Sequence, residues 1–191
     1  MILLNVPNLV TLSRIILIPL IIGLYYMPED WLSDHGRNVS ATLVFALAAI
    51  TDWLDGYLAR RLNQMSAFGA FLDPVADKLI VVGALVILLH LNRVDMLVAL
   101  IIIGREIAIS ALREWMAKVG QAKSVAVAFV GKLKTVSQMV AIPLLLYHER
   151  LFGLVDCQWL GTILINIAAV LTVVSMLYYL RKALPHAALR G

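Results

Sequence analysis

Charged residues are scarce in this chain of 191 residues. They make up 15% of it, while 62% of the residues are hydrophobic and the mean hydropathy is +0.91. A typical soluble domain carries about 25% charged residues, so this composition excludes that class of protein. Apolar runs of roughly 20 residues recur along the chain, and each is long enough to cross a hydrocarbon core of about 30 Å. We therefore expect an integral membrane protein.

Cysteine is nearly absent as well. With Cys157 as the single cysteine, the chain has no internal disulfide framework, and the lack of any Cys or His cluster argues against a thiolate zinc site. The apolar N-terminal segment lacks a basic stretch and a small-residue cleavage site, so we expect it to be retained as a membrane span. No internal repeat, low-complexity tract or long linker divides the chain. Residues 1–191 are therefore expected to form a single membrane domain.

The apolar runs predict an all-α fold with six transmembrane helices, separated by segments in which polar and turn-forming residues cluster. The predicted helices cover residues 7–26, 39–60, 68–91, 95–118, 125–147 and 158–180. With this layout all Lys and Arg residues except Arg37, Arg93 and Arg150 fall on or toward one face of the membrane. By the positive-inside rule that face is cytoplasmic, and it carries both termini.

Four aspartates lie at the cytoplasmic ends of the second and third predicted helices, namely Asp52, Asp55, Asp73 and Asp77. The first two are three residues apart and the last two are four apart, so each pair lies on one face of its helix. Because the connection between the two helices is short, they are expected to be antiparallel neighbours. The two pairs of carboxylates can therefore converge on one small volume.

Clustered carboxylates in a membrane need compensating positive charge. Each costs about 2.5–3.5 kcal/mol at the centre of a membrane helix, and the anions also repel one another. Arg60, Arg61 and Lys78 lie nearby, but Arg61 is expected to point to water, which leaves too few cations. Hard divalent ions bound by carboxylate oxygens would supply the missing charge, and Mg²⁺ or Mn²⁺ fits a site without Cys or His. Two such ions about 3.5–4 Å apart would stabilise phosphoryl displacement. A salt-bridge network or an ion path is the alternative.

The spacing of these acids and of the small residues between them forms an extended motif, D-x2-D-G-x2-A-R-x8-G-x3-D-x3-D, over residues 52–77. At every fixed position it resembles the signature of the CDP-alcohol phosphotransferases. The stretches NVPNLVTLSRIILIPL, FGAFLDPVADKL, GREIAISALREWMA and GKLKTVSQMVA are similar to the bacterial branch of that family that forms phosphatidylglycerophosphate. Gly56, Ala59 and Gly69 leave room for a bulky ligand to approach the backbone, although close helix packing would explain each of them equally well.

The resemblance implies a bacterial inner-membrane enzyme. It would transfer the phosphatidyl group of CDP-diacylglycerol to sn-glycerol 3-phosphate and release CMP, as a homodimer with no nucleic-acid partner and with its active site facing the cytoplasm. Two divalent cations, Mg²⁺ or Mn²⁺, are implied, with Asp77 also acting as the general base. The implied metal ligands are Asp52, Asp55, Asp73 and Asp77. The implied CDP-diacylglycerol contacts are Asn8, Thr11, Asp52, Asp55, Gly56, Ala59, Arg60 and Gly69. For Asn8 and Thr11, capping of the first helix is an equal alternative.

Basic residues farther along the chain predict a site for the phosphate of the acceptor. Arg105 and Arg113 lie eight residues apart, on roughly the same side of a helix, and Lys132 and Lys134 lie in the cytoplasmic part of the fifth helix. Such donors suit a phosphate group. Alternatively, Arg105 could pair with an aspartate of the site, and Arg113 and Lys134 could reach lipid headgroups. Glu106 is expected to point elsewhere on its helix.

Two rival functions remain open at this point. One is a transferase of the same fold with another acceptor, such as a cardiolipin synthase that uses phosphatidylglycerol, or a relative that uses serine or inositol phosphate. The other is a cation transporter or proton carrier that uses the intramembrane acids. A transporter needs polar access from both sides of the membrane. The outer halves of the second and third helices, SATLVFALAAI and VVGALVILLH, are almost wholly apolar, which disfavours it.

Overall fold

A computed structural model describes residues 5–61, 66–118, 120 and 129–188, with the backbone alone for residues 6, 7, 53, 55–60, 129 and 185–188. The described residues form an all-helical protein with six helices and one short antiparallel hairpin. The helices are α1 (Val6–Tyr26), α2 (Asp34–Arg61), α3 (Ala67–His90), α4 (Met96–Lys118), α5 (Phe129–Tyr147) and α6 (Cys157–Ala188). The hairpin between α5 and α6 consists of β1 (Arg150–Leu151) and β2 (Val155–Asp156). The predicted number and order of helices are confirmed.

Several helix boundaries differ from the prediction. α2 begins at Asp34 rather than at residue 39, because the polar segment that resembles a loop caps and starts the helix. Ser33 Oγ accepts a hydrogen bond from the backbone N–H of Gly36 (3.2 Å), and Asp34 pairs with Arg37 (2.8 Å) in the first turn. α6 continues to Ala188, beyond the predicted end at residue 180. Residues 125–128, predicted to open the fifth helix, lie outside the described residues.

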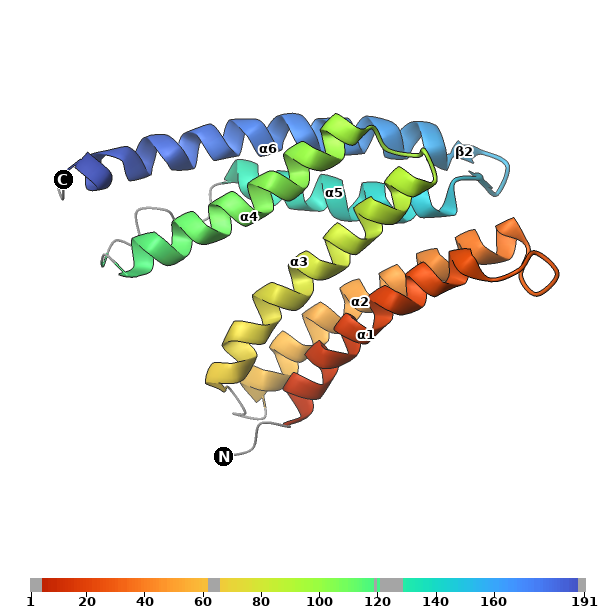
Figure 1. The fold of residues 1–191 in the computed structure, drawn as a ribbon, viewed down its shortest axis with the longest axis horizontal. Helices are drawn as coiled ribbons and strands as arrows, with labels where there is room; N and C mark the ends of the chain where they lie inside the picture. Colours follow the sequence, from red (N-terminus) through yellow and green to blue (C-terminus); the bar gives the residue numbers. More distant parts are fainter. Residues whose placement is uncertain (1–4, 62–65, 119, 121–128, 189–191) are drawn as a thin grey trace.

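The six helices form two groups of three. In the first helix group α1 packs along α2 and α3, and in the second helix group α6 packs along α4 and α5. The groups share a hydrophobic core near the end where α3 turns into α4, built around Phe45, Leu85, Ile102 and Leu146. They spread apart toward the opposite end, where α1 begins and α6 ends (Figure 1). A cavity lined by residues of both groups lies between them.

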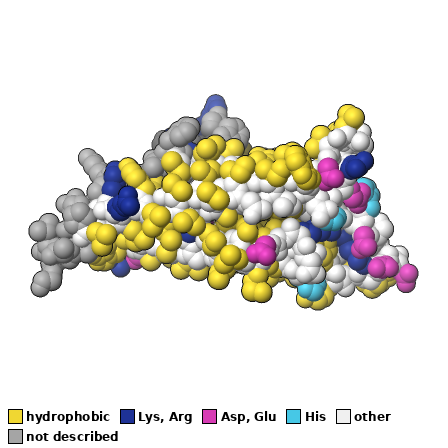
Figure 2. Space-filling view, turned by 90° about the horizontal axis from the view of Figure 1, so that it is seen from above, with side chains coloured by type: hydrophobic (Ala, Val, Ile, Leu, Met, Phe, Trp, Pro, Cys, Tyr) yellow, Lys and Arg dark blue, Asp and Glu magenta, His cyan; other side chains and the backbone are white. Residues whose placement is uncertain are grey.

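Apolar side chains cover much of the outside of the molecule. Every helix exposes at least one large aliphatic residue, for example Leu20, Leu47, Val86, Leu100, Val140 and Val170. One face of the molecule has a broad hydrophobic middle, with acidic residues and histidines gathered toward the end that carries the hairpin (Figure 2). Among the described residues, Asn8–Tyr26 and Cys157–Leu184 are long and apolar enough to cross a membrane. A membrane protein is therefore supported, and the crossing of all six helices stays a prediction.

The end that carries the hairpin is tied together by Arg93, in the turn between α3 and α4. Its Nη1 donates to the main-chain oxygens of Leu145 (3.2 Å) and Leu146 (2.7 Å), which α5 leaves without helical partners. Its Nη2 donates to Asn38 Oδ1 of α2 (2.8 Å). Tyr25 of α1 donates to the same amide oxygen (3.4 Å). One guanidinium therefore joins both helix groups at the end remote from the site.

Candidate active site

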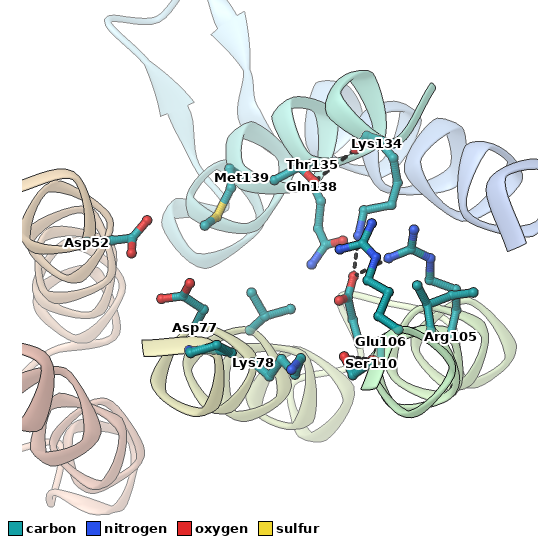
Figure 3. Close-up of a pocket in the computed structure, with 15 residues that line it drawn as sticks. Asp52, Asp77, Lys78, Arg105, Glu106, Ser110, Lys134, Thr135, Gln138 and Met139 are labelled. Atoms are coloured by element: carbon teal, nitrogen blue, oxygen red, sulfur yellow. Dashed lines mark hydrogen bonds and ion pairs between the residues drawn. The ribbon is translucent and has the colours of Figure 1, made fainter. Parts of the chain in front are cut away.

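A cavity of about 530 Å³ opens between the two helix groups, lined by residues of α2, α3, α4 and α5. Charged side chains line two sides of it, with Lys78 near Asp77 on one side and Glu106 between basic residues on the other (Figure 3). Asp52 and Asp77 lie on the side of the first helix group, and Arg105 and Lys134 lie on the side of the second. A cavity of this size suits a small ligand. Its charge distribution suits a ligand with an anionic end and a second, reactive end near the carboxylates.

Arg14 of α1 joins the two carboxylates of the acidic side. Its side chain is only 1% exposed, and its Nη1 donates to Asp52 Oδ1 (2.7 Å) and to Asp77 Oδ1. A guanidinium buried this deeply is stable only when it is paired. The sequence prediction counted Arg14 only as a cation of the cytoplasmic face and found too few cations near the acids. The available signal was the spacing of Asn8, Thr11 and Arg14, polar residues that recur every third position of an apolar helix.

Asn8 and Thr11 contact α3, and neither caps α1. The cap is Asn5, whose side chain accepts a hydrogen bond from the backbone N–H of Asn8 (3.0 Å). Asn8 Nδ2 instead donates to Ser66 Oγ (3.1 Å), and Thr11 Oγ1 donates to Asp73 Oδ1 (2.8 Å). The structure thus disfavours the capping alternative. Both side chains hold the start of α1 against the start of α3.

Gly69 makes this contact between α1 and α3 possible. A Cβ atom at position 69 would lie 2.6 Å from Asn8 Oδ1, a distance that no real Cβ tolerates without movement of its neighbour. The backbone N–H of Gly69 also donates to Ser66 Oγ (2.9 Å), which caps α3. Close helix packing therefore accounts for this glycine, one of the two explanations that the sequence left open.

The remaining residues of the motif are only partly described. Asp55, Gly56, Ala59 and Arg60 belong to α2, but their side chains lie outside the described residues. Among the side chains that the structure does describe, no group of three or more His, Cys, Asp and Glu residues could hold a metal ion. Asp52 and Asp77 nonetheless present carboxylate oxygens to one shared positive group, Arg14. This donor set fits a hard divalent cation, which takes oxygen ligands.

The basic side of the cavity is organised around Glu106 of α4. Lys134 of α5 is buried and donates to Glu106 Oε1, and Arg105 Nη1 lies 3.4 Å from the same oxygen. The expectation that Glu106 points elsewhere on the helix is wrong. Adjacent positions on a helix differ by about 100° in direction, but both of these long side chains reach the cavity. The suggested ion pair between Arg105 and an aspartate is not observed among the described residues.

Arg113 and Lys132 have different surroundings. Arg113 lines the cavity, and its Nη2 donates to the hydroxyl of Tyr179 (3.4 Å), with the guanidinium 5.3 Å from the centre of the tyrosine ring. Lys132 is exposed and does not line the cavity. Of the basic residues predicted from the sequence, the structure thus brings Arg105, Arg113 and Lys134 together and leaves Lys132 outside.

Gln138 also lines the cavity, and the sequence prediction missed it. It follows Lys134 by one turn of α5 and is 3% exposed. Its Oε1 atom is buried without a hydrogen-bond partner in the structure. The position four residues after Lys134, on the same helix face, is the signal that would have found it.

Comparisons with known proteins show which proteins the chain resembles. Residues 4–174 match the family model of the CDP-alcohol phosphatidyltransferases. The chain is 48% identical over 182 residues to the CDP-diacylglycerol–glycerol-3-phosphate 3-phosphatidyltransferase of Escherichia coli strain K12, with 94% of each chain covered. The proteins of the same name from Shigella flexneri serotype 5b and Shigella boydii serotype 4 show the same identity and coverage. The family resemblance predicted from the motif is confirmed.

Proposed function

The chain belongs to the CDP-alcohol phosphatidyltransferase family, and we propose that it transfers the phosphatidyl group of CDP-diacylglycerol to sn-glycerol 3-phosphate. The names of its relatives give this donor and acceptor for those proteins, and the transfer yields phosphatidylglycerophosphate and CMP. The observation that carries the proposal is the cavity between the helix groups, with Asp52 and Asp77 on one side and Arg105, Arg113 and Lys134 around Glu106 on the other. A small acceptor with a phosphate group at one end matches that division of charge.

Asp77 is proposed as the general base. Its carboxylate lines the cavity and is 44% exposed, so an acceptor can reach it. Asp77 takes the proton of the terminal hydroxyl, and the hydroxyl oxygen forms a bond to the phosphorus of the phosphatidyl group. The bond from that phosphorus to the oxygen shared with CMP breaks, and CMP leaves with the electron pair. Arg14 holds Asp77 and Asp52 in place on the acidic side.

Divalent metal ions are proposed at the acidic side, because enzymes of this family generally depend on them. The proposed ligands of two ions, Mg²⁺ or Mn²⁺, are Asp52, Asp55, Asp73 and Asp77. When bound, such ions neutralise charge on the diphosphate and stabilise displacement at phosphorus. Thr11 orients Asp73 through its hydrogen bond, just as Arg14 orients Asp52.

The donor is proposed to bind near the start of α3 and the end of α2. Gly56, Ala59 and Arg60 are its proposed contacts on α2, together with the aspartates of the motif. Asn8 and Gly69 lie at the junction of α1 with α3, where the Asn8 side chain and the capped end of α3 meet. We propose that this junction forms the floor of the nucleotide site.

The basic side is proposed to bind the phosphate of the acceptor. Arg105 and Lys134 are held together by Glu106, and Arg113 is held by Tyr179. Arginine offers bidentate hydrogen bonds to phosphate, and a buried lysine adds a point charge. Lys132, which is exposed, would only attract the anionic acceptor from outside the cavity.

We further propose that all six helices cross the bacterial inner membrane, with the cavity and both termini on the cytoplasmic side. Within the part of the chain that the structure describes, two helices meet the length and apolarity required for a span. α2, α3, α4 and α5 carry the charged residues that line the cavity between the helix groups. The excess of Lys and Arg at the open end supports the orientation. Homodimerisation stays a prediction from the family resemblance.

Purified full-length protein with CDP-diacylglycerol and labelled glycerol 3-phosphate tests the function. A labelled lipid and an equal amount of CMP are expected, and Asp77→Asn should abolish both while the protein keeps its helical content. Phosphatidylglycerol, serine and inositol phosphate serve as competing acceptors in the same assay. Preferential use of one of these would assign the chain to another branch of the family. Absence of any CDP-diacylglycerol-dependent product would refute the proposed reaction.

A further inference from the structure

Gln138 is a buried polar side chain whose chemistry the reaction described above does not use. Its Oε1 atom is buried without a partner, although the side chain is only 3% exposed. Leaving such an acceptor unpaired costs about 1–3 kcal/mol, so it calls for an explanation. Among the described residues the other buried side-chain oxygen without a partner belongs to Thr172, which does not line the cavity. Gln138 is thus the buried acceptor that is available to a ligand there.

The position of Gln138 is intermediate between the two charged sides. Figure 3 shows its side chain extending from α5 into the space between Asp77 and the cluster of Glu106, Arg105 and Lys134. A ligand with its phosphate at the basic cluster and its reacting hydroxyl at Asp77 must therefore pass beside this amide. The amide meets the middle of such a ligand.

The other neutral polar side chains at the cavity already have partners in their own helices. Ser110 Oγ donates to the main-chain oxygen of Glu106 (2.6 Å), and Thr135 Oγ1 donates to that of Gly131 (3.0 Å). A phosphate oxygen cannot satisfy Gln138 Oε1, because both atoms are acceptors. The missing partner must donate, and a hydroxyl group on the middle of the ligand is able to do so.

We propose that Gln138 accepts a hydrogen bond from the middle hydroxyl of the acceptor and makes the enzyme select a three-carbon phosphate that carries this hydroxyl. The proposal rests on the proposed function, since it assumes the phosphate and the reacting hydroxyl at the two ends of the cavity. It adds a specificity-determining residue on α5 between the phosphate site and the general base. A site built to bind a hydroxyl rejects the analogue that lacks it, because its own polar group is then left unpaired.

The test compares two acceptors that differ only in that hydroxyl. They are sn-glycerol 3-phosphate and 3-hydroxypropyl phosphate, which keeps the phosphate and the terminal hydroxyl. For the wild-type protein, kcat/KM should be about ten-fold higher for glycerol 3-phosphate, the order expected for one hydrogen bond to a buried group. Gln138→Met keeps the length of the side chain without the acceptor atom. It should reduce the ratio to about one, through loss of activity on glycerol 3-phosphate alone.

Matched variants separate this role from a structural one. Gln158→Met makes the same chemical change at an exposed position at the start of α6, and it should keep the wild-type ratio. Gln138→Glu keeps an acceptor oxygen and should also keep the preference, even if its total activity falls. Turnover of 3-hydroxypropyl phosphate by Gln138→Met shows that the variant is folded.

The outcomes decide the inference separately from the proposed function. A wild-type protein that uses both acceptors equally well overturns the role of Gln138. A Gln138→Met protein that keeps the preference for glycerol 3-phosphate overturns it as well. If Gln138→Met is inactive on both acceptors, the ratio for Gln138→Glu decides, and loss of its preference overturns the inference. A wild-type protein that makes no product from glycerol 3-phosphate refutes the proposed function instead.

Discussion

Replacing Glu106 with Gln tests whether the basic side of the cavity depends on one buried carboxylate. The Lys134 side chain is 4% exposed and that of Glu106 is 18% exposed, so the pair is largely removed from water. Breaking a buried ion pair from one side typically costs about 3–5 kcal/mol, because the other charge stays buried without compensation. Gln still offers an acceptor oxygen, so we expect the low end, about 3 kcal/mol. For a chain of this size that corresponds to a fall in Tm of about 6–12 °C.

The assay is thermal unfolding of the full-length protein in one detergent, followed by circular dichroism. The matched control is Glu114→Gln on the same helix, which breaks the exposed pair of Glu114 with Lys118 (2.8 Å) and should leave Tm unchanged. Lys134→Met should destabilise as well. The double variant Glu106→Gln/Lys134→Met should lose less than the two single variants together, with a coupling of about 1 kcal/mol or more. Equal Tm changes for Glu106→Gln and Glu114→Gln, or strict additivity in the cycle, would refute this reasoning.

Three further predictions concern the helix junctions and the metal. Gly69→Ala places a Cβ atom 2.6 Å from Asn8 Oδ1 and should cost about 1–3 kcal/mol of unfolding free energy; Asn8→Ala in the same chain should recover part of the loss in thermal unfolding. Arg93→Met removes charged hydrogen bonds to Leu145, Leu146 and Asn38 and should cost about 3–5 kcal/mol. Its KM for glycerol 3-phosphate should not change, since Arg93 lies far from the cavity, and a raised KM would contradict that separation. Chelation with EDTA should abolish transfer, and added Mg²⁺ or Mn²⁺ should restore it; full activity after chelation would exclude a required metal.

The fold was largely predictable because each helix is an apolar run bounded by polar residues. The errors lie where local capping overrides composition. The segment from Asp34 to Asn38 contains Gly36 and several polar residues, which suggest a loop, yet Ser33 and Asp34 start a helix there. The strand pair after α5 depends on left-handed backbone at Phe152 and Gly153, and only the glycine signals it in the sequence. Sequence patterns also cannot say how the two helix groups separate, because this depends on contacts between distant residues.

The acidic side was more predictable than the basic side for a physical reason. Because a short connection joins the two helices, the spacing of Asp52 and Asp77 lets their carboxylates meet at one guanidinium, whereas Asp73 contacts Thr11. Arg14 meets them from a helix that is distant in the sequence, and no local pattern identifies that pairing. Glu106 and Gln138 line a cavity wide enough to admit side chains that point in different directions from their helices. Helix periodicity therefore misassigned Glu106, whereas it does place Gln138 on the helix face of Lys134, a signal that the sequence prediction did not use.

The division of the molecule into two helix groups has a consequence for how such an enzyme can change over evolution. On the proposed assignment, the first helix group carries the donor chemistry, and the second carries recognition of the acceptor through α4 and α5. The two sets of residues share a cavity, but they lie on different helices. Substitutions that adapt the second group to another alcohol therefore leave the residues that activate the donor in place. The arrangement allows new acceptors to be adopted one side chain at a time, without rebuilding the reaction itself.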